Sequence, residues 1–213
     1  MGIDKRRERE RERRRQQIIA ASRRVFTAKG FSRTTVKDIA REAELSPGTI
    51  YIYFKSKDEL YAVLSVRMLK HLNLQLHRVQ AHRAAHPGDI TGAIKKVLCE
   101  AYRIDPPLFI TLSHLQASEM LDNISTELLD QITDLSRQSL ETLAALFAAE
   151  IDRGAIAKRD PYTLALILWG MFSGLILWEE SKRTLDPRKN FLVPTLDTAF
   201  AIMGRGVRHA ASV

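Results

Sequence analysis

Apolar residues recur at helical spacing along most of the chain, and polar residues with glycine or proline separate the apolar runs. The first stripe passes through Ile18, Ala21 and Val25 and ends at Gly30, since glycine readily takes the left-handed conformation that closes a helix. No useful length of the sequence alternates as a β-strand does. The sequence therefore predicts an all-α protein of about nine helices, at about residues 14–29, 35–43, 46–54, 56–85, 89–102, 106–118, 126–152, 161–181 and 192–208.

Three helix starts between residues 34 and 60 carry capping signals. Thr35 with Asp38, and Ser56 with Glu59, have the spacing of a capping box. Ser46 is a typical N-cap residue, and it precedes a proline at the first helical position. Two short helices joined by a tight turn at 44–46, with a third helix directly after them, predict a helix-turn-helix unit.

The helix predicted at 46–54 has more apolar surface than its packing needs. Ile50 and Phe54, four residues apart, are sufficient to anchor it in a core. Gly48 lets a backbone approach DNA closely, Thr49 suits a base edge such as a thymine methyl, and tyrosine hydroxyls suit phosphates. The alternative is a generic three-helix bundle with surface tyrosines, which we consider less well supported because exposed aromatic rings do not favour solubility.

Positive charge is concentrated in the same part of the chain. The 213 residues carry a net charge of +8; residues 1–60 have 16 Lys and Arg against 9 Asp and Glu, whereas residues 61–213 have 17 against 16. A basic module on a nearly neutral body indicates a polyanionic partner for the module. The charged tail, 1–12, is interpreted as a solvated and frayed end in which Glu and Arg at three- and four-residue spacing weakly support a helix. A DNA-binding arm is the alternative, and the glutamates interspersed among the arginines argue against it.

Residues 13–64 resemble the N-terminal DNA-binding region of the TetR/AcrR family of bacterial transcriptional regulators. The resemblance rests on ASRRVFTAKGF at 21–31, T-V-x-D-I-A at 35–40 and F-x-S-K-x-E-L at 54–60. Glu44 stands where the family usually has a turn glycine, so the turn must tolerate a side chain. Ile52 and Tyr53 stand where the family often has an aromatic residue and a histidine, which implies a change of specificity and not of function. Together, the residues and the resemblance give as candidate DNA contacts Thr35, Lys37, Ser46, Pro47, Gly48, Thr49, Tyr51, Tyr53, Lys55 and Lys57.

The resemblance implies that a helical ligand-binding and dimerisation domain, 61–213, follows the DNA-binding domain, 13–60. Independently, the run 164–178 is hydrophobic on all sides, which predicts that one face packs on the body and the other on a second subunit. With 15 residues it is shorter than the roughly 20 that cross a bilayer, so we expect no membrane span. The predicted dimer contacts on the last two helices are Leu166, Gly170, Gly174, Leu177, Leu196, Phe200 and Met203.

Large apolar residues on the middle helices are candidates for an effector pocket, although such residues at helical spacing are usually core. The candidates are Met68, Leu72, Tyr102, Phe109, Leu112, His114, Met120, Leu135, Phe147, Trp169 and Phe172. The near-neutral charge of this part favours an apolar effector.

The sequence offers little for other chemistry. The single cysteine, Cys99, excludes an intrachain disulfide and is interpreted as a helix-buried thiol. His82 and His86 lack a third ligand, so we predict neither a metal nor a cofactor, and there is no catalytic constellation. The sequence predicts a cytoplasmic homodimeric repressor that a small effector releases from a palindromic double-stranded DNA operator. The alternative is a DNA-binding regulator without a small-molecule effector.

Overall fold

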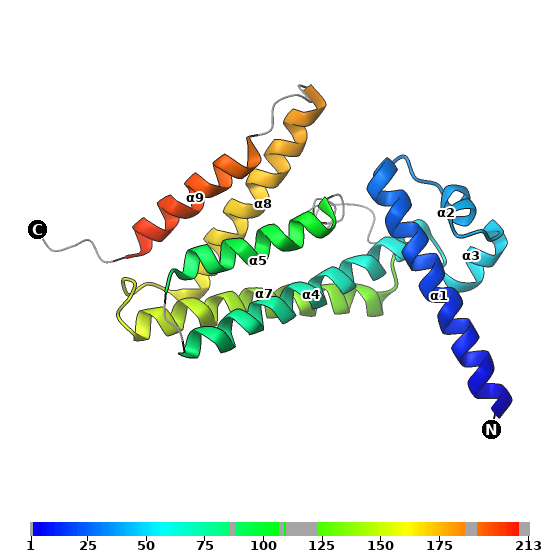
Figure 1. Ribbon diagram of the computed structural model, residues 1–213, viewed down its shortest axis with the longest axis horizontal. Helices are drawn as coiled ribbons and strands as arrows, with labels where there is room; N and C mark the ends of the chain where they lie inside the picture. Colours follow the sequence, from blue (N-terminus) through cyan, green and yellow to red (C-terminus); the bar gives the residue numbers. More distant parts are fainter. Residues whose placement is uncertain (1, 86–87, 107–108, 110–122, 186–190, 209–213) are drawn as a thin grey trace, which may run out of the picture. The chain divides into compact units, whose positions relative to one another are not determined.

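The structure, a computed structural model, describes residues 2–85, 88–106, 109, 123–185 and 191–208 (Figure 1). These residues form helices and no strand, which confirms the all-α prediction. The predicted helix at 106–118 falls almost wholly outside the described residues. The helices are α1 Gly2–Lys29, α2 Val36–Glu42, α3 Pro47–Tyr53, α4 Lys57–Ala85, α5 Ile90–Ile104, α7 Thr126–Asp152, α8 Pro161–Leu185 and α9 Leu192–Val207.

Helix α1 begins twelve residues before its predicted start, so the prediction of a frayed tail is wrong. Oppositely charged residues three and four apart support the added turns: Arg13 Nη2 lies 2.8 Å from Glu10 Oε1, and Arg14 Nη2 lies 3.9 Å from the same oxygen. The glutamates that argued against a DNA-binding arm therefore stabilise a helix.

The capping predictions are confirmed for α2 and α3, and one of the two hydrogen bonds predicted at the start of α4 is present. Thr35 and Asp38 form the full capping box, and Ser46 Oγ accepts from the Thr49 N–H at 3.1 Å. At the start of α4, Ser56 Oγ accepts from the Glu59 N–H at 3.0 Å as predicted. The Glu59 carboxylate, however, accepts from the Lys55 N–H at 2.5 Å, one residue earlier than a capping box requires.

The chain divides into two compact units. The first comprises Met1–Met68 and Asp105–Thr133, and the second Leu69–Ile104 and Asp134–Val213. This division differs from the predicted single boundary at residue 60, because a later segment joins the N-terminal unit. Helices α4 and α7 each begin in the first unit and end in the second.

Three aromatic rings form the centre of the first unit. The ring of Phe26 lies 5.7 Å from that of Phe31 and 5.2 Å from that of Tyr61, and the Phe31 and Tyr61 rings are 4.9 Å apart. Ile39 and Ile50 are also buried. This core holds α1, α2, α3 and the first turns of α4 together.

In the second unit, α9 packs against both α5 and α8. The rings of Phe172 on α8 and Phe200 on α9 meet edge to face, 6.3 Å apart. Leu196 and Met203 are buried on the same side of α9. Leu196, Phe200 and Met203 therefore pack within their own chain, and their contact with a second subunit stays a prediction.

Helix α8 has one buried and one exposed apolar face, as predicted. Leu164, Leu168, Phe172 and Ile176 are buried. The opposite side exposes a row of residues at four-residue spacing: Tyr162, Leu166, Gly170, Gly174 and Trp178.

The apolar stretch of α8 is longer than the 15 residues on which the sequence argument against a membrane span rested. The stretch Pro161–Glu179 is long and apolar enough to cross a membrane by length and composition, and a third of it is buried inside the chain. Its regular buried face is nevertheless that of a core helix.

Candidate nucleic-acid interface

Helix α3 turns one side to the core and the other to solvent. Ile50 is 1% exposed and Phe54, directly after the helix, 2%, so the predicted anchors are confirmed. Tyr51 and Ile52 on the outer side are 55% and 73% exposed, and Tyr53 is half-buried. A helix with exposed aromatic and aliphatic side chains presents an apolar surface to a partner.

The first turn of α3 is built for close approach. Its exposed residues are Pro47 and Gly48, and Thr49 is half-buried with its hydroxyl 2.9 Å from Ser46 Oγ. A Cβ placed on Gly48 would meet only Ser46 Oγ, at an ordinary 3.7 Å. The fold itself therefore does not need glycine at this position.

The turn before α3 carries a side chain in the left-handed region. Glu44 has φ of 54°, and its N–H donates to the Arg41 carbonyl at 3.1 Å. The Leu45 N–H donates to the Ala40 carbonyl at 2.9 Å, which closes the end of α2. The turn thus keeps the geometry for which glycine is better suited, and it accommodates the glutamate at the cost of backbone strain.

Asp38 organises the start of α2. Its carboxylate accepts from Lys29 Nζ at 2.6 Å, from the Thr35 hydroxyl at 2.9 Å and from the Thr35 N–H at 3.1 Å. The Lys29 hydrogen bond, followed by those from Thr35, holds the pKa of Asp38 at about 2. The Thr35 hydroxyl in turn accepts from the Asp38 N–H at 3.2 Å, while Lys37 is exposed. The N–H groups of Thr35 and Asp38 are both used within the capping box. Lys37 is therefore better placed than Thr35 to contact a phosphate.

The ammonium of Lys57, a predicted phosphate contact, binds two backbone carbonyls. Its Nζ donates to the carbonyls of Phe31 at 3.2 Å and Thr34 at 3.3 Å, and it lies 4.4 Å from the centroid of the Phe31 ring. An ammonium has three N–H donors, so two are used to hold the segment between α1 and α2. Lys55, by contrast, is exposed and remains a candidate phosphate contact.

The sequence singled out Ile52 only as a departure from the family pattern, and it was not among the candidate DNA contacts. It is the most exposed large apolar side chain of the described residues, and it lies beside Tyr51 on the outer face of α3. The signal was present: Ile52 does not share the four-residue spacing of Ile50 and Phe54, so the core could not use it.

The described candidates for the effector site are distributed over both units. Of its candidates, Met68 and Phe109 are buried in the first unit, and Leu72, Phe147 and Phe172 in the second. Tyr102, Leu135 and Trp169 are half-buried in the second unit. Leu112, His114 and Met120 lie outside the described residues, as does His86 of the rejected histidine pair. Among the described side chains no group of three or more metal-binding residues occurs.

Comparison with known proteins agrees with the geometry of the first unit. Residues 18–64 match the family model of bacterial regulatory proteins of the tetR family. An uncharacterized HTH-type transcriptional regulator of Bacillus subtilis, YhgD, is 25% identical over 175 residues, which cover 81% of this chain and 88% of that protein. The match to the family model includes α2 and α3 entirely.

Solved structures share the fold along most of the chain. The TetR family transcriptional regulator PfmR from Thermus thermophilus has a TM-score of 0.67 at 22% identity, covering 91% of this chain and 96% of its own. The regulator FadR from Bacillus subtilis, solved in complex with stearoyl-CoA, has a TM-score of 0.66 at 20% identity, covering 91% and 99%. The likeness therefore extends through both units.

Proposed function

The chain belongs to the TetR/AcrR family of transcriptional regulators, and from that premise we propose that it is a homodimeric repressor which a small apolar effector releases from a palindromic operator. Regulators of this family bind DNA and are not enzymes. The observation that carries the proposal is the exposed apolar face of α3 at Tyr51 and Ile52. Such a face fits a major groove, where a side chain reads base edges and thymine methyl groups.

The DNA contacts are proposed to divide into two kinds. Pro47, Gly48, Thr49, Tyr51, Ile52 and Tyr53 would enter the groove. Thr35, Lys37, Ser46 and Lys55 would meet phosphates from its rims. Lys57 would act mainly by holding the loop that joins α1 to α2, because its ammonium already binds the Phe31 and Thr34 carbonyls.

Substitutions on α3 test the DNA contacts. A duplex that binds the wild-type protein is first selected from a random-sequence library, and its affinity is then measured by fluorescence anisotropy. Tyr51→Ala, Ile52→Ala and Tyr53→Ala should each weaken binding by about 1–3 kcal/mol, the range of a base contact. Leu74→Ala, at a half-exposed position on α4, is the control and should bind as the wild type does. Unchanged binding by all three α3 variants would contradict the assignment.

The dimer is proposed to form through the exposed row of α8. Gly170 and Gly174 have open space where a Cβ would lie, so a second helix could approach closely there. Leu166 and Trp178, 47% and 64% exposed, would be covered in a two-fold interface, with half-buried Leu177 at its edge. On α9, exposed Ile202 lies away from the buried face and is the proposed contact in place of the buried residues that the sequence suggested.

Light scattering after size exclusion tests the dimer. The wild-type chain should elute with twice its mass of 24.2 kDa, and Gly170→Arg should elute as a monomer. Leu74→Arg introduces the same charge on α4 and should remain dimeric. A wild-type chain that is monomeric at micromolar concentration would contradict the proposal.

The effector is proposed to act through α4, which continues from the DNA-binding unit into the second unit. Leu72, Phe147 and Phe172 supply a large apolar interior in that second unit. FadR binds a fatty-acyl thioester, so stearoyl-CoA is a reasonable first probe. The probe should lower the affinity of the protein for the selected duplex. A panel of apolar compounds without any such effect would favour a regulator controlled without a small molecule. Because the matching family consists of bacterial regulatory proteins that act on DNA, we propose that the protein is cytoplasmic.

A further inference from the structure

The face of α1 that is buried in the three-helix core carries arginines where the helix extends past that core toward the N-terminus. Ile18, Ala21 and Val25 lie on the core-facing side of α1 and are buried. The same alternation of three- and four-residue steps, followed toward the N-terminus, reaches Arg14, Arg11 and Arg7. Arg7 and Arg11 are exposed, and the Arg14 side chain is one-third exposed. Where no core covers the stripe, its residues are cationic; we name Arg7, Arg11 and Arg14 the arginine row.

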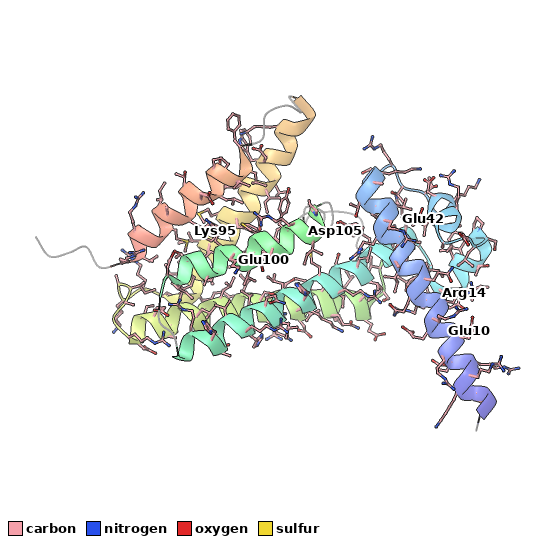
Figure 2. The ribbon with its side chains drawn as sticks, in the orientation of Figure 1. Glu10, Arg14, Glu42, Lys95, Glu100 and Asp105 are labelled. Atoms are coloured by element: carbon pink, nitrogen blue, oxygen red, sulfur yellow. The ribbon has the colours of Figure 1, made fainter. Side chains whose placement is uncertain are left out.

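The arginine row lies on the side of α1 that faces the helix-turn-helix. Gln17 Nε2 donates to the carbonyl of Ala43, in the turn between α2 and α3, at 2.8 Å. Arg15 lies 5.3 Å from the centroid of the Phe54 ring, directly after α3. Figure 2 shows Glu10 on the part of α1 that projects beyond α3, with Arg14 nearer to α3. A duplex bound to α3 would therefore meet the arginine row before it met the opposite side of α1.

The projecting part of α1 is a formed helix in the absence of a partner. Glu10 pairs with Arg13 and Arg14, Glu12 accepts a hydrogen bond from Gln16, and Arg9 Nε donates to the Lys5 carbonyl at 3.2 Å. Twelve residues of α-helix extend about 18 Å, and successive members of the row are about 5–6 Å apart along the axis. Residues 4–15 contain eight Lys and Arg against four Asp and Glu. A rigid and net cationic helix loses little conformational entropy when it binds an anion.

We propose that residues 4–15 form a helical arm whose arginine row binds the phosphates that flank each operator half-site. The proposal rests on the DNA binding proposed above and extends its footprint beyond the groove that α3 occupies. Guanidinium groups suit this task because they bind phosphate oxygens in bidentate geometry. The contact carries no base readout; it contributes affinity and a strong dependence on salt.

The opposite face of the arm supplies a matched control. Lys5, Arg9 and Arg13 repeat every four residues and lie about 180° around the helix from the arginine row. The test compares Arg7→Gln/Arg11→Gln/Arg14→Gln with Lys5→Gln/Arg9→Gln/Arg13→Gln, two variants that lose the same charge. Arg7→Lys/Arg11→Lys/Arg14→Lys keeps the charge and serves as the rescue. Circular dichroism verifies that all three retain the helicity of the wild type.

Binding to the selected duplex is measured by anisotropy over a series of KCl concentrations, with hydroxyl-radical footprints of each complex. The arginine-row variant should weaken binding at least about tenfold. The slope of the logarithm of the binding constant against the logarithm of the KCl concentration should also become less steep. The expected change is about 0.9 unit for each lost phosphate contact, up to about 3 units per protomer. Its footprint should shorten at both ends, while the opposite-face variant and the lysine variant stay close to the wild type.

Two results would overturn the inference, and they differ from a failure of the proposed function. Equal losses in the arginine-row and opposite-face variants would show only a general effect of net charge. An unchanged slope and footprint in the arginine-row variant would show that the arm does not touch DNA. If the wild-type protein selects no duplex at all, the DNA-binding function itself fails and the arm proposal fails with it.

Discussion

Arg83 on α4 and Glu150 on α7 form an ion pair buried within the second unit, with 2.8 Å between Arg83 Nη2 and Glu150 Oε1. The two side chains are 7% and 4% exposed. The same oxygen accepts from Arg83 Nε at 3.1 Å and from Arg153 Nη1 at 2.9 Å, and Arg83 Nη2 also donates to the Gly88 carbonyl at 2.5 Å. One carboxylate thus connects the end of α4 to the end of α7.

Removal of one partner of this pair should be strongly destabilising. Arg83→Met should lower the free energy of unfolding by about 3–5 kcal/mol, because it leaves a buried carboxylate with less compensation. Urea denaturation measures the loss. Arg137→Met is the control: Arg137 pairs with Asp134 and Glu141, but all three are more than half exposed, so the change should be within about 1 kcal/mol. Similar losses in both variants would contradict a special role for burial.

The pKa of Asp38 predicts a dependence of stability on acid. Because the hydrogen bonds from Lys29 and Thr35 lower the pKa to about 2 from the ordinary 3.8, the folded state favours the charged carboxylate. This stabilisation is complete above pH about 4 and is lost as the pH falls toward 2. The wild type should therefore have a higher free energy of unfolding than Asp38→Asn above pH about 4, and this difference should decrease as the pH falls toward 2. Urea denaturation at several pH values measures it.

An NMR titration gives an independent measurement of the same carboxylate. Lys29→Met removes the largest cause of the shift, so it should raise the pKa of Asp38 toward 3.8. A wild-type pKa already close to 3.8 would refute the hydrogen-bonding geometry at the start of α2.

Glycine at position 44 should stabilise the protein. Glu44 has φ of 54°, and the left-handed conformation costs a residue with a Cβ roughly 1–2 kcal/mol. Glycine avoids this cost but loses more entropy on folding, so Glu44→Gly should gain about 1 kcal/mol or less in thermal or urea denaturation. Ala20→Gly, at an exposed position inside α1, should instead lose about 1 kcal/mol. A loss in both variants would mean that the turn has no strain to relieve.

The close approach of α9 to α5 at Gly204 should not tolerate a methyl group. A Cβ at Gly204 would lie 2.6 Å from Thr91 Oγ1, which is held by its hydrogen bond to Asp89 Oδ1 at 2.8 Å. Gly204→Ala should cost about 1–3 kcal/mol by overpacking. Gly206→Ala, two residues away with nothing within 4 Å, should be neutral or stabilising by up to about 1 kcal/mol. Denaturation curves of the two variants compare the sites directly.

Local signals explain which parts of the fold could be predicted. The bounds of α7 agree with its predicted range, and the starts of α2 and α3 follow from Thr35, Ser46 and Pro47, since caps depend only on nearby residues. The outward face of α3 was also predictable, because Ile50 and Phe54 are the anchors that the core needs.

Features that depend on distant residues could not be predicted in the same way. The apolar stripe of α9 has the same sequence pattern whether it packs on its own chain or on a partner. The contact of Phe200 with Phe172 of the same chain is visible only in the structure. Lys57 was interpreted as a phosphate contact because the carbonyls that it binds are more than twenty residues away. The start of α1 was predicted too late because residues 2–13 have no apolar periodicity, and the charge spacing alone indicated only weak support for a helix.

Two uninterrupted helices, α4 and α7, pass from one compact unit to the other. A chimera that exchanges the DNA-binding unit for that of a relative must therefore be joined inside helices, and not in a loop. One residue inserted in α4 after Met68 would rotate Leu72 and Leu76 by about 100° relative to Leu60 and Leu64 and turn them off their buried face. Splice points in this protein should therefore preserve helical phase, with insertions of seven residues tolerated better than insertions of one or two.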